Sequence, residues 1–115
     1  IIFTTMNNGK NLLKIIEEMR KFDPHMESQS IAIFFYVCEY GGANGISMKT
    51  ISKELDLAQS TVSRNCYKLG DKTVKGPGIG LLQSFEDPME RRRKLVRLTP
   101  RGKRVYRTLS ELVVE

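Results

Sequence analysis

Apolar and charged residues alternate in the first stretch of the chain with the period of a helix. Between residues 7 and 22 four apolar residues fall on one stripe of the helix: Leu12, Ile15, Ile16 and Met19. Leu13 lies beside this stripe. Lysine and glutamate fill most of the other positions, and apolar spacings of three and four residues predict an amphipathic helix. Asp23-Pro24 ends this helix, because a residue that precedes proline resists the helical region.

A second segment, residues 27–40, contains an almost wholly apolar run at 31–38. Taken by itself, that run is compatible with a buried strand. The length of the segment, a serine cap at Ser28 or Ser30, and the two glycines at 41–42 favour a buried helix instead.

Two shorter helices are predicted next, joined by a tight turn at residues 56–58. Ser47 caps the first helix, which runs to residue 55 with Met48, Ile51 and Leu55 on its inner face. The second helix runs to about residue 69, and its buried stripe is Val62, Cys66 and Leu69. Its opposite face is polar and becomes cationic toward the end: Gln59, Ser60, Ser63, Arg64, Tyr67 and Lys68. Two short helices of this kind predict a helix-turn-helix.

The last third of the chain changes from a loop to strands and then to a helix. Residues 72–80 break all periodicity and are predicted to be a loop. Residues 81–85 and 95–98 are short strand candidates, and 86–94 form the polar turn between them. Thr99 as N-cap and Pro100 in the first turn open a last helix. Its apolar face is Val105, Leu109, Leu112 and Val113.

Together these elements predict one mainly α-helical domain over residues 1–115. A three-helix core with a two-stranded β wing occupies 27–98, which is a winged helix-turn-helix. An N-terminal helix within 1–24 and a C-terminal helix over 99–115 flank it.

Charge is distributed unevenly along the chain. Residues 1–46 carry four Lys/Arg against five Asp/Glu, a net of −1, and residues 47–115 carry fifteen against eight, a net of +7. Between Arg91 and Arg107 there are nine basic residues and no acidic one. These cations are interleaved with apolar residues at strand and helix spacing, so the segment is expected to fold. A folded cationic ridge favours a phosphate backbone as partner.

Other classes of function find little support. No apolar run approaches the roughly 18 residues of a membrane span, and the opening residues lack the basic leader of a signal peptide. Cys38 and Cys66 lie inside apolar patterns, which favours core positions in a reducing cytoplasm over a disulfide or a redox-sensing thiol. His25, the single histidine, is expected in a surface turn. Without paired carboxylates, a ligand cluster or a nucleophile constellation, neither an enzyme nor a metal or other cofactor is expected.

The chain resembles the MarR family of winged helix-turn-helix regulators over nearly all of its length. The helix-turn-helix portion, residues 46–64, is similar to that of the family, although many bacterial regulators share this pattern. The wing is more specific, because the family shows an acidic residue, any residue, an arginine, five residues, Leu-Thr and a Gly slightly beyond. Five residues meet this spacing: Glu90, Arg92, Leu98, Thr99 and Gly102.

The resemblance implies roles for several residues and an oligomeric state. Arg92 would enter a DNA minor groove from the wing, and Glu90, which stands where the family usually has Asp, would orient an arginine nearby. The N- and C-terminal helices would build a homodimer, with a small-molecule effector of unknown identity between them and the DNA-binding lobe. The loop at 76–80 is longer than the usual link, and family members usually continue beyond the equivalent of Glu115. A smaller or differently made dimer is therefore expected.

The chemistry of the residues agrees with a double-stranded DNA partner. The N-terminus of the second helix of the motif offers free N–H groups to phosphate, while Gln59 and Arg64 suit base edges. Tyr67 and Lys68 suit the backbone. A weakly hydrated guanidinium suits a narrow minor groove, so Arg92 ranks before Arg91 and Arg93. The predicted DNA-binding residues are Gln59, Ser60, Thr61, Ser63, Arg64, Tyr67, Lys68, Arg91, Arg92, Arg93 and Lys94.

We therefore expect a homodimeric transcription regulator, more often a repressor than an activator, on a pseudo-palindromic site. The recognition helix would enter the major groove and the wing the neighbouring minor groove. One alternative is a winged-helix module for replication, packaging or protein contacts that regulates no promoter. A second is an RNA-binding module, which the lack of aromatic stacking platforms disfavours.

Overall fold

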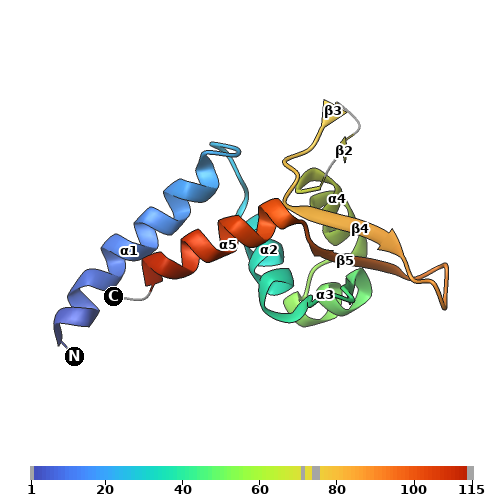
Figure 1. Cartoon of the computed structure of the whole chain (residues 1–115), viewed down its shortest axis with the longest axis horizontal. Coiled ribbons are helices and arrows are strands. Elements are labelled where there is room, and N and C mark those ends of the chain that lie inside the picture. The colour runs from blue at the N-terminus through green and yellow to red at the C-terminus, as the bar shows by residue number, and fades with distance from the viewer. Residues whose placement is uncertain (1, 71, 74–75, 114–115) are drawn as a thin grey trace.

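The computed structural model describes residues 2–70, 72–73 and 76–113, with side chains at 9–70 and 78–113. Its elements are α1 (Ile2–Arg20), α2 (Ser28–Tyr40), β1 (Ile46–Ser47), α3 (Met48–Leu55), α4 (Gln59–Lys68), β2 (Lys72–Thr73), β3 (Gly76–Pro77), β4 (Leu82–Glu86), β5 (Lys94–Leu98) and α5 (Pro100–Val113). The molecule is elongated, 50 × 29 × 26 Å. Helices α1 and α5 lie side by side at one end, and the β4–β5 hairpin projects from the other (Figure 1).

All five predicted helices are present, so the mainly α-helical expectation is confirmed. The apolar run at 31–38 is helical, which decides between the strand and helix interpretations. Helix α1 begins at Ile2, five residues before the predicted start, and ends at Arg20. The sequence before residue 7 contains no proline, so nothing in it prevents the earlier start. In the described part of the chain, no helix is both long and apolar enough to cross a membrane.

Two of the predicted helix caps are confirmed and one is wrong. The Ser47 hydroxyl accepts a hydrogen bond from the Thr50 N–H at 3.1 Å, as an N-cap of α3 does. The Thr99 hydroxyl accepts from the Gly102 N–H at 3.0 Å and caps α5. Helix α2, in contrast, has Glu27 at its N-cap without a side-chain bond. Ser30, predicted as a cap alternative, is fully buried and faces the core instead.

The wing belongs to a three-stranded sheet with the order β1-β5-β4, so the predicted two-stranded wing is incomplete. In β1, Ile46 pairs with Val96 and Ser47 with Leu95. A two-residue strand is too short to show alternation in the sequence, which explains why it was not predicted. Strands β4 and β5 pair in register from Leu82↔Leu98 to Glu86↔Lys94, close to the predicted bounds.

The expectation of an irregular loop over residues 72–80 is also corrected. Strands β2 and β3 form a two-residue antiparallel pair, Lys72↔Pro77 and Thr73↔Gly76, whereas 74–75 lie outside the described residues. Glycine and proline are depleted in strands, so the composition of this segment concealed the pairing.

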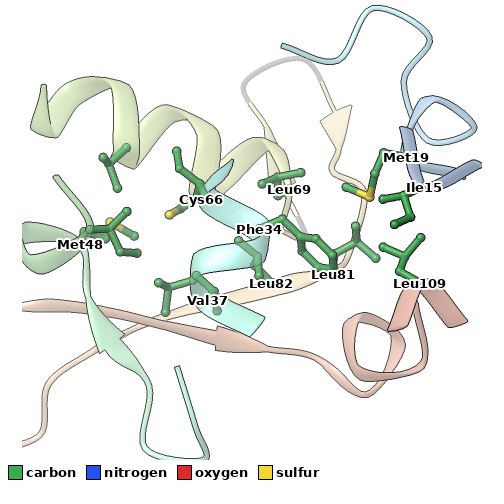
Figure 2. Packing of buried hydrophobic residues seen from close by; sticks show 14 residues of the cluster. Ile15, Met19, Phe34, Val37, Met48, Cys66, Leu69, Leu81, Leu82 and Leu109 are labelled. Carbon is green, nitrogen blue, oxygen red and sulfur yellow. The ribbon is translucent and has the colours of Figure 1, made fainter. Parts of the chain in front are cut away.

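One hydrophobic core connects the two ends of the molecule (Figure 2). Met48 and Cys66 lie at the helix-turn-helix end, and Ile15, Met19 and Leu109 lie where α1 meets α5. The predicted stripe of α4 is confirmed, since Val62, Cys66 and Leu69 are all fully buried. On α5, however, Leu109 is buried and Val113 is 60% exposed, so its predicted apolar face is only partly covered.

Thr99 and Gly102 have a structural role that accounts for their place in the sequence pattern. The Thr99 N–H donates to the Leu81 carbonyl at 3.0 Å, and its hydroxyl donates to the Gly80 carbonyl at 2.7 Å. A Cβ added at Gly102 would overlap the Leu81 carbonyl oxygen. The start of α5 can therefore approach the start of β4 only if residue 102 lacks a side chain.

Candidate nucleic-acid interface

A concave surface of about 660 Å³ lies between the starts of α3 and α4 and the tip of the wing. We call it the α4–wing groove. Its lining residues are Ser47, Met48, Lys49, Thr50, Gln59, Ser60, Ser63, Glu90, Arg92, Arg93 and Lys94. The fold thus brings together three predicted residues of the recognition helix and the cationic tip of the wing, about thirty positions apart in sequence.

Helix α4 presents an uncapped N-terminus at this groove. Its N-cap is Ala58, which has no side-chain hydrogen bond to offer, and the first helical bond is Val62 N–H to the Ala58 carbonyl at 3.1 Å. The N–H groups of the first turn therefore lack intrahelical acceptors. The side chains of Ser47 and Thr99 cap α3 and α5, whereas the partial positive charge at the start of α4 stays open to an anion.

The tip of the wing is held by its own backbone. The Asp87 N–H donates to the Arg93 carbonyl at 2.9 Å and closes the hairpin. Two turns follow each other inside it, Glu90 N–H to Asp87 carbonyl at 3.2 Å and Arg93 N–H to Glu90 carbonyl at 2.9 Å. Arg91 and Arg92 occupy the two central positions of the second turn, and both are exposed.

The four consecutive cations of the wing differ in their acidic neighbours. Arg93 Nε lies 3.9 Å from Asp87 Oδ2, and Lys94 Nζ lies 3.5 Å from Glu86 Oε2. Among the described residues, no ion pair is recorded for Arg91 or Arg92. Since Arg92 also lines the α4–wing groove, it combines an unpaired charge with a position opposite α4.

Glu90 is exposed and lines the groove, but no ion pair joins it to an arginine in the part of the chain that is described. The acid that approaches a wing arginine is Asp87. Its other oxygen accepts from the Met89 N–H at 2.9 Å, so it also fixes the turn. The orienting role expected for Glu90 stays a prediction, and Asp87 is the residue that the sequence pattern missed.

The other predicted residues of α4 lie outside the groove. Arg64 and Tyr67 are exposed farther along the helix, and Thr61 is half-buried. Lys68 Nζ lies 3.2 Å from Asp23 Oδ2, in the connection between α1 and α2. The charge of Lys68 is therefore partly neutralised inside the protein, which weakens its candidacy as a phosphate contact.

Lys49 and Thr50 were not predicted as site residues, although both line the groove. They lie in the first turn of α3, where the first helix of a helix-turn-helix crosses the DNA backbone. The Ser47 cap marks that helix start in the sequence, so it could have indicated these two residues as site residues.

The two cysteines lie in or near the core, and burial raises the pKa of both thiols. The pKa rises to about 12 at Cys38 and at Cys66, with desolvation as the first cause in each case. A thiol with such a pKa is a poor nucleophile, in agreement with the expected core positions. His25 is exposed in the turn after Asp23, as expected. The described residues hold no group of three His, Cys, Asp or Glu suited to a metal ion.

A second concave surface, of about 520 Å³, lies at the opposite end of the molecule between α1, α2 and α5. We call it the α1–α5 groove. It is lined almost entirely by apolar and aromatic side chains: Leu12, Ile15, Ile16, Phe35, Tyr106, Leu109, Ser110 and Val113. Leu12 and Val113 are 59% and 60% exposed, so large apolar groups face solvent there.

Comparisons with known proteins agree with the fold. No protein-family model matches the chain, and no curated protein sequence matches it. Among solved structures, the Staphylococcus aureus MepR–DNA complex has a TM-score of 0.71 at 20% identity, over 97% of this chain and 82% of that one. The PcaV transcriptional regulator of Streptomyces coelicolor, in complex with its natural ligand, has a TM-score of 0.61 at 24% identity, over 91% and 69%.

A third solved structure carries the family name that the sequence pattern suggests. It is a transcriptional regulator of the MarR family from Rhodococcus sp. RHA1, with a TM-score of 0.64 at 19% identity, over 96% of this chain and 70% of that one. At these identities the likeness is one of fold. The chain has the winged-helix fold of MarR-type transcription regulators.

Proposed function

We propose that the protein binds double-stranded DNA in a sequence-specific manner as a homodimeric transcription regulator, acting as a repressor. The α4–wing groove is the observation that carries this proposal. The uncapped N-terminus of α4 lies at one side of it and Arg92, which has no ion pair among the described residues, at the other, and both favour phosphate and groove edges. Helix α4 would enter the major groove and the wing the neighbouring minor groove.

Four of the predicted residues of α4, and Lys49 of α3, have a specific place in this proposal. Gln59, Ser60 and Ser63 line the groove and would meet base edges or nearby phosphates. Arg64, exposed one turn farther along α4, would read a base. Lys49 would bind a phosphate at the start of α3.

The dimer is proposed from the α1–α5 groove. Exposed apolar side chains such as Leu12, Ile16 and Val113 gain stability when a second copy removes them from water. A two-fold axis through this end would leave both wings free, and half-sites about one helical turn apart, roughly 34–36 Å, would match two recognition helices.

The solved relatives suggest further features of the same proposal. MepR has been solved on DNA, and PcaV has been solved with its natural ligand. By analogy we propose that a small-molecule effector binds between the α1–α5 end and the DNA-binding lobe. Action on chromosomal DNA would place the protein in the cytoplasm, where no enzymatic activity is required of it.

Selection of bound duplexes from a random DNA pool tests the proposal. The expected result is one enriched, pseudo-palindromic sequence. Arg64→Ala should relax the enriched sequence at one position in each half-site, because it removes a base contact. Enrichment of no sequence by the wild-type protein would reject the regulator and favour the alternative, a winged-helix module that binds without sequence preference.

A further inference from the structure

Asn65 is a polar residue on the apolar stripe of the recognition helix. It lies three residues after Val62 and four before Leu69, and it is 1% exposed. A position with this spacing is normally apolar, since the stripe of an amphipathic helix includes the third as well as the fourth residue. Asparagine is also a weak helix former. Neither helix propensity nor core packing therefore explains an asparagine at this place.

Both ends of the Asn65 amide are hydrogen-bonded. The Ser30 hydroxyl, fully buried on α2, donates to Asn65 Oδ1 at 2.5 Å. Asn65 Nδ2 donates to the Thr61 carbonyl of the preceding turn at 2.9 Å. The reversed amide would point its oxygen at that carbonyl oxygen, so the network fixes the orientation of the side chain. The bond joins residues that are 35 positions apart in sequence.

We propose that the Ser30–Asn65 pair positions the recognition helix, setting its rotation and axial place on α2. Asn65 and Ser30 would touch no DNA and would act through Gln59, Ser60 and Ser63, which project from the other face of α4 into the α4–wing groove. This inference rests on the proposed function. It assigns a role in DNA sequence specificity to the buried Ser30–Asn65 pair.

The reason is that apolar contacts alone define the rotation of a helix poorly. The hydrophobic effect is non-directional, whereas a hydrogen bond inside the protein requires a short distance and a narrow angle. A shift of α4 by one residue turns its side chains by about 100° and moves them about 1.5 Å along the axis. Such a shift would break the Ser30 bond and leave two polar groups unsatisfied in the core. Buried asparagines select the register of coiled coils by the same physics.

Helix α2 is a suitable reference for this positioning. Ile33, Phe34 and Val37 anchor it in the middle of the core, and Figure 2 shows Phe34 and Val37 packed between the helix-turn-helix end and the α1–α5 end. Ser30 lies one turn before Ile33 and Phe34, so its hydroxyl is held by a helix that is itself immobilised. A hydrogen bond to Ser30 thus connects α4 to a helix that buries Ile33, Phe34 and Val37 in the core.

The double substitution Ser30→Ala with Asn65→Leu tests the proposal. It replaces both partners by apolar groups, which leaves no unsatisfied atom and is expected to keep the protein folded with an unchanged or higher Tm. The measurement is the ratio of two affinities at one salt concentration: that for the duplex selected by the wild-type protein and that for a scrambled duplex of the same length. We expect this ratio to fall roughly tenfold or more, because misdirected side chains lose base contacts while phosphate contacts persist.

Val62→Ala is the matched control. Val62 lies on the same stripe of α4 and is fully buried, but it takes no part in the hydrogen bonds. It should lower the Tm by opening a cavity and leave the affinity ratio unchanged. Ser30→Ala alone, which removes a single oxygen atom, provides a second reading of the ratio if the double variant does not fold.

The outcomes separate this inference from the proposed function. A wild-type protein that does not distinguish the two duplexes rejects the function itself. A wild-type protein that distinguishes them, with a folded double variant of equal ratio, rejects the positioning role and leaves the function intact. If the double variant does not fold, an unchanged ratio in Ser30→Ala rejects the positioning role in the same way. If the affinity ratio fell as far in Val62→Ala as in the double variant, Asn65 would be an ordinary core residue without a positioning role.

Discussion

The two ends of the molecule are incomplete in different ways. At the α4–wing groove the open groups are polar: an uncapped helix N-terminus and the guanidinium of Arg92. At the α1–α5 groove they are apolar, with Leu12, Ile16 and Val113 facing solvent. One hydrophobic core connects both ends. The two ends therefore differ in the chemistry of their exposed groups and not in how well each end is packed.

This contrast separates the kinds of partner. Free N–H groups and an arginine gain most from an anion, and their attraction weakens as salt increases. Exposed leucine, isoleucine and valine gain from any apolar surface of matching shape, and salt does not screen that gain. In the proposed function a second copy of the chain would cover one end and DNA the other, and each end can be tested without altering the other.

The largest effect is expected from breaking the apolar end. Leu12→Asp with Ile16→Asp places two carboxylates in the α1–α5 groove, where a second copy would bury them unpaired. We expect a monomer in sedimentation at micromolar concentration. Affinity for the selected palindromic duplex should fall by roughly 10²–10⁴, because the second half-site no longer benefits from an effective concentration.

Leu13→Asp is the control for that variant. Leu13 is 60% exposed, much like Leu12 at 59%, but it does not line the α1–α5 groove. It should remain dimeric and keep its affinity for DNA. A wild-type protein that sediments as a monomer would remove the two-fold model altogether.

Arg92→Ala should give the next largest effect, at the opposite end. Loss of a minor-groove arginine should weaken DNA binding by about 1–3 kcal/mol and reduce the dependence of affinity on salt. Titration of a labelled duplex at several salt concentrations measures both. The oligomeric state should not change, since the β4–β5 hairpin projects from the end opposite to where α1 and α5 lie side by side (Figure 1).

Lys103→Ala provides the comparison for Arg92→Ala. Lys103 is an exposed cation on α5 that does not line the α4–wing groove. Its removal should change affinity much less than removal of Arg92, although both variants lose one positive charge. Equal losses of DNA affinity in the two variants would mean that net charge alone attracts the protein to DNA and that the wing makes no specific contact in a groove.

The periodicity of the sequence was sufficient to predict the helices but insufficient to predict the whole sheet. Val62, Cys66 and Leu69 repeat over about two helical turns, so the buried stripe of α4 could be predicted directly. Strand β1 has two residues and exists only because Ile46 meets Val96 of a strand fifty positions later. Non-local pairing of that kind leaves no periodic signal in a short segment.

The candidate site shows the same limit. The sequence placed Gln59, Ser60 and Ser63 on one face of α4, and they line the groove. It ranked Arg92 before Arg91 and Arg93, but only for the chemistry of a guanidinium in a minor groove. The structure adds that Asp87 and Glu86 lie near Arg93 and Lys94 and leave Arg92 without an ion pair among the described residues. Lys68 was predicted to contact DNA, and the sequence did not show that it also pairs with Asp23. Partners in three dimensions decide which charges are available, and spacing along the chain does not record them.

Gly102→Ala is expected to damage the junction between the two ends. The added methyl would overlap the Leu81 carbonyl, and a backbone atom cannot move aside as a side chain does. We expect a loss of about 1–3 kcal/mol in the free energy of unfolding by chemical denaturation.

The matched substitution is Gly9→Ala, where a Cβ meets nothing within 4 Å in helix α1. It should gain up to about 1 kcal/mol, because alanine favours a helix over glycine. Equal effects of the two alanines would mean that α5 can shift away from β4 without cost.

The smallest effect is expected from Asp23→Asn, which breaks the ion pair with Lys68 but keeps an acceptor for the His25 N–H. The pKa of Asp23 is lowered, and the largest cause is the hydrogen bond from the His25 N–H. Burial opposes this effect, and the hydrogen bond and charge of Lys68 lower the pKa further. A lowered pKa means that the ionised carboxylate stabilises the fold above the unfolded value of about 3.9, and that this contribution is lost as pH falls through the folded value.

Asp23→Asn should therefore cost less than about 1 kcal/mol near neutral pH, as is usual for a surface pair, and nothing once the wild-type carboxyl is protonated. Chemical denaturation of both proteins across the acid range measures the difference. The variant also tests Lys68 as a DNA contact, because the freed ammonium should raise affinity slightly at low salt. Glu18→Gln, which breaks the Glu18–Lys21 pair on α1, should leave affinity unchanged. An Asp23→Asn protein with unaltered DNA affinity at low salt would remove Lys68 from the proposed interface.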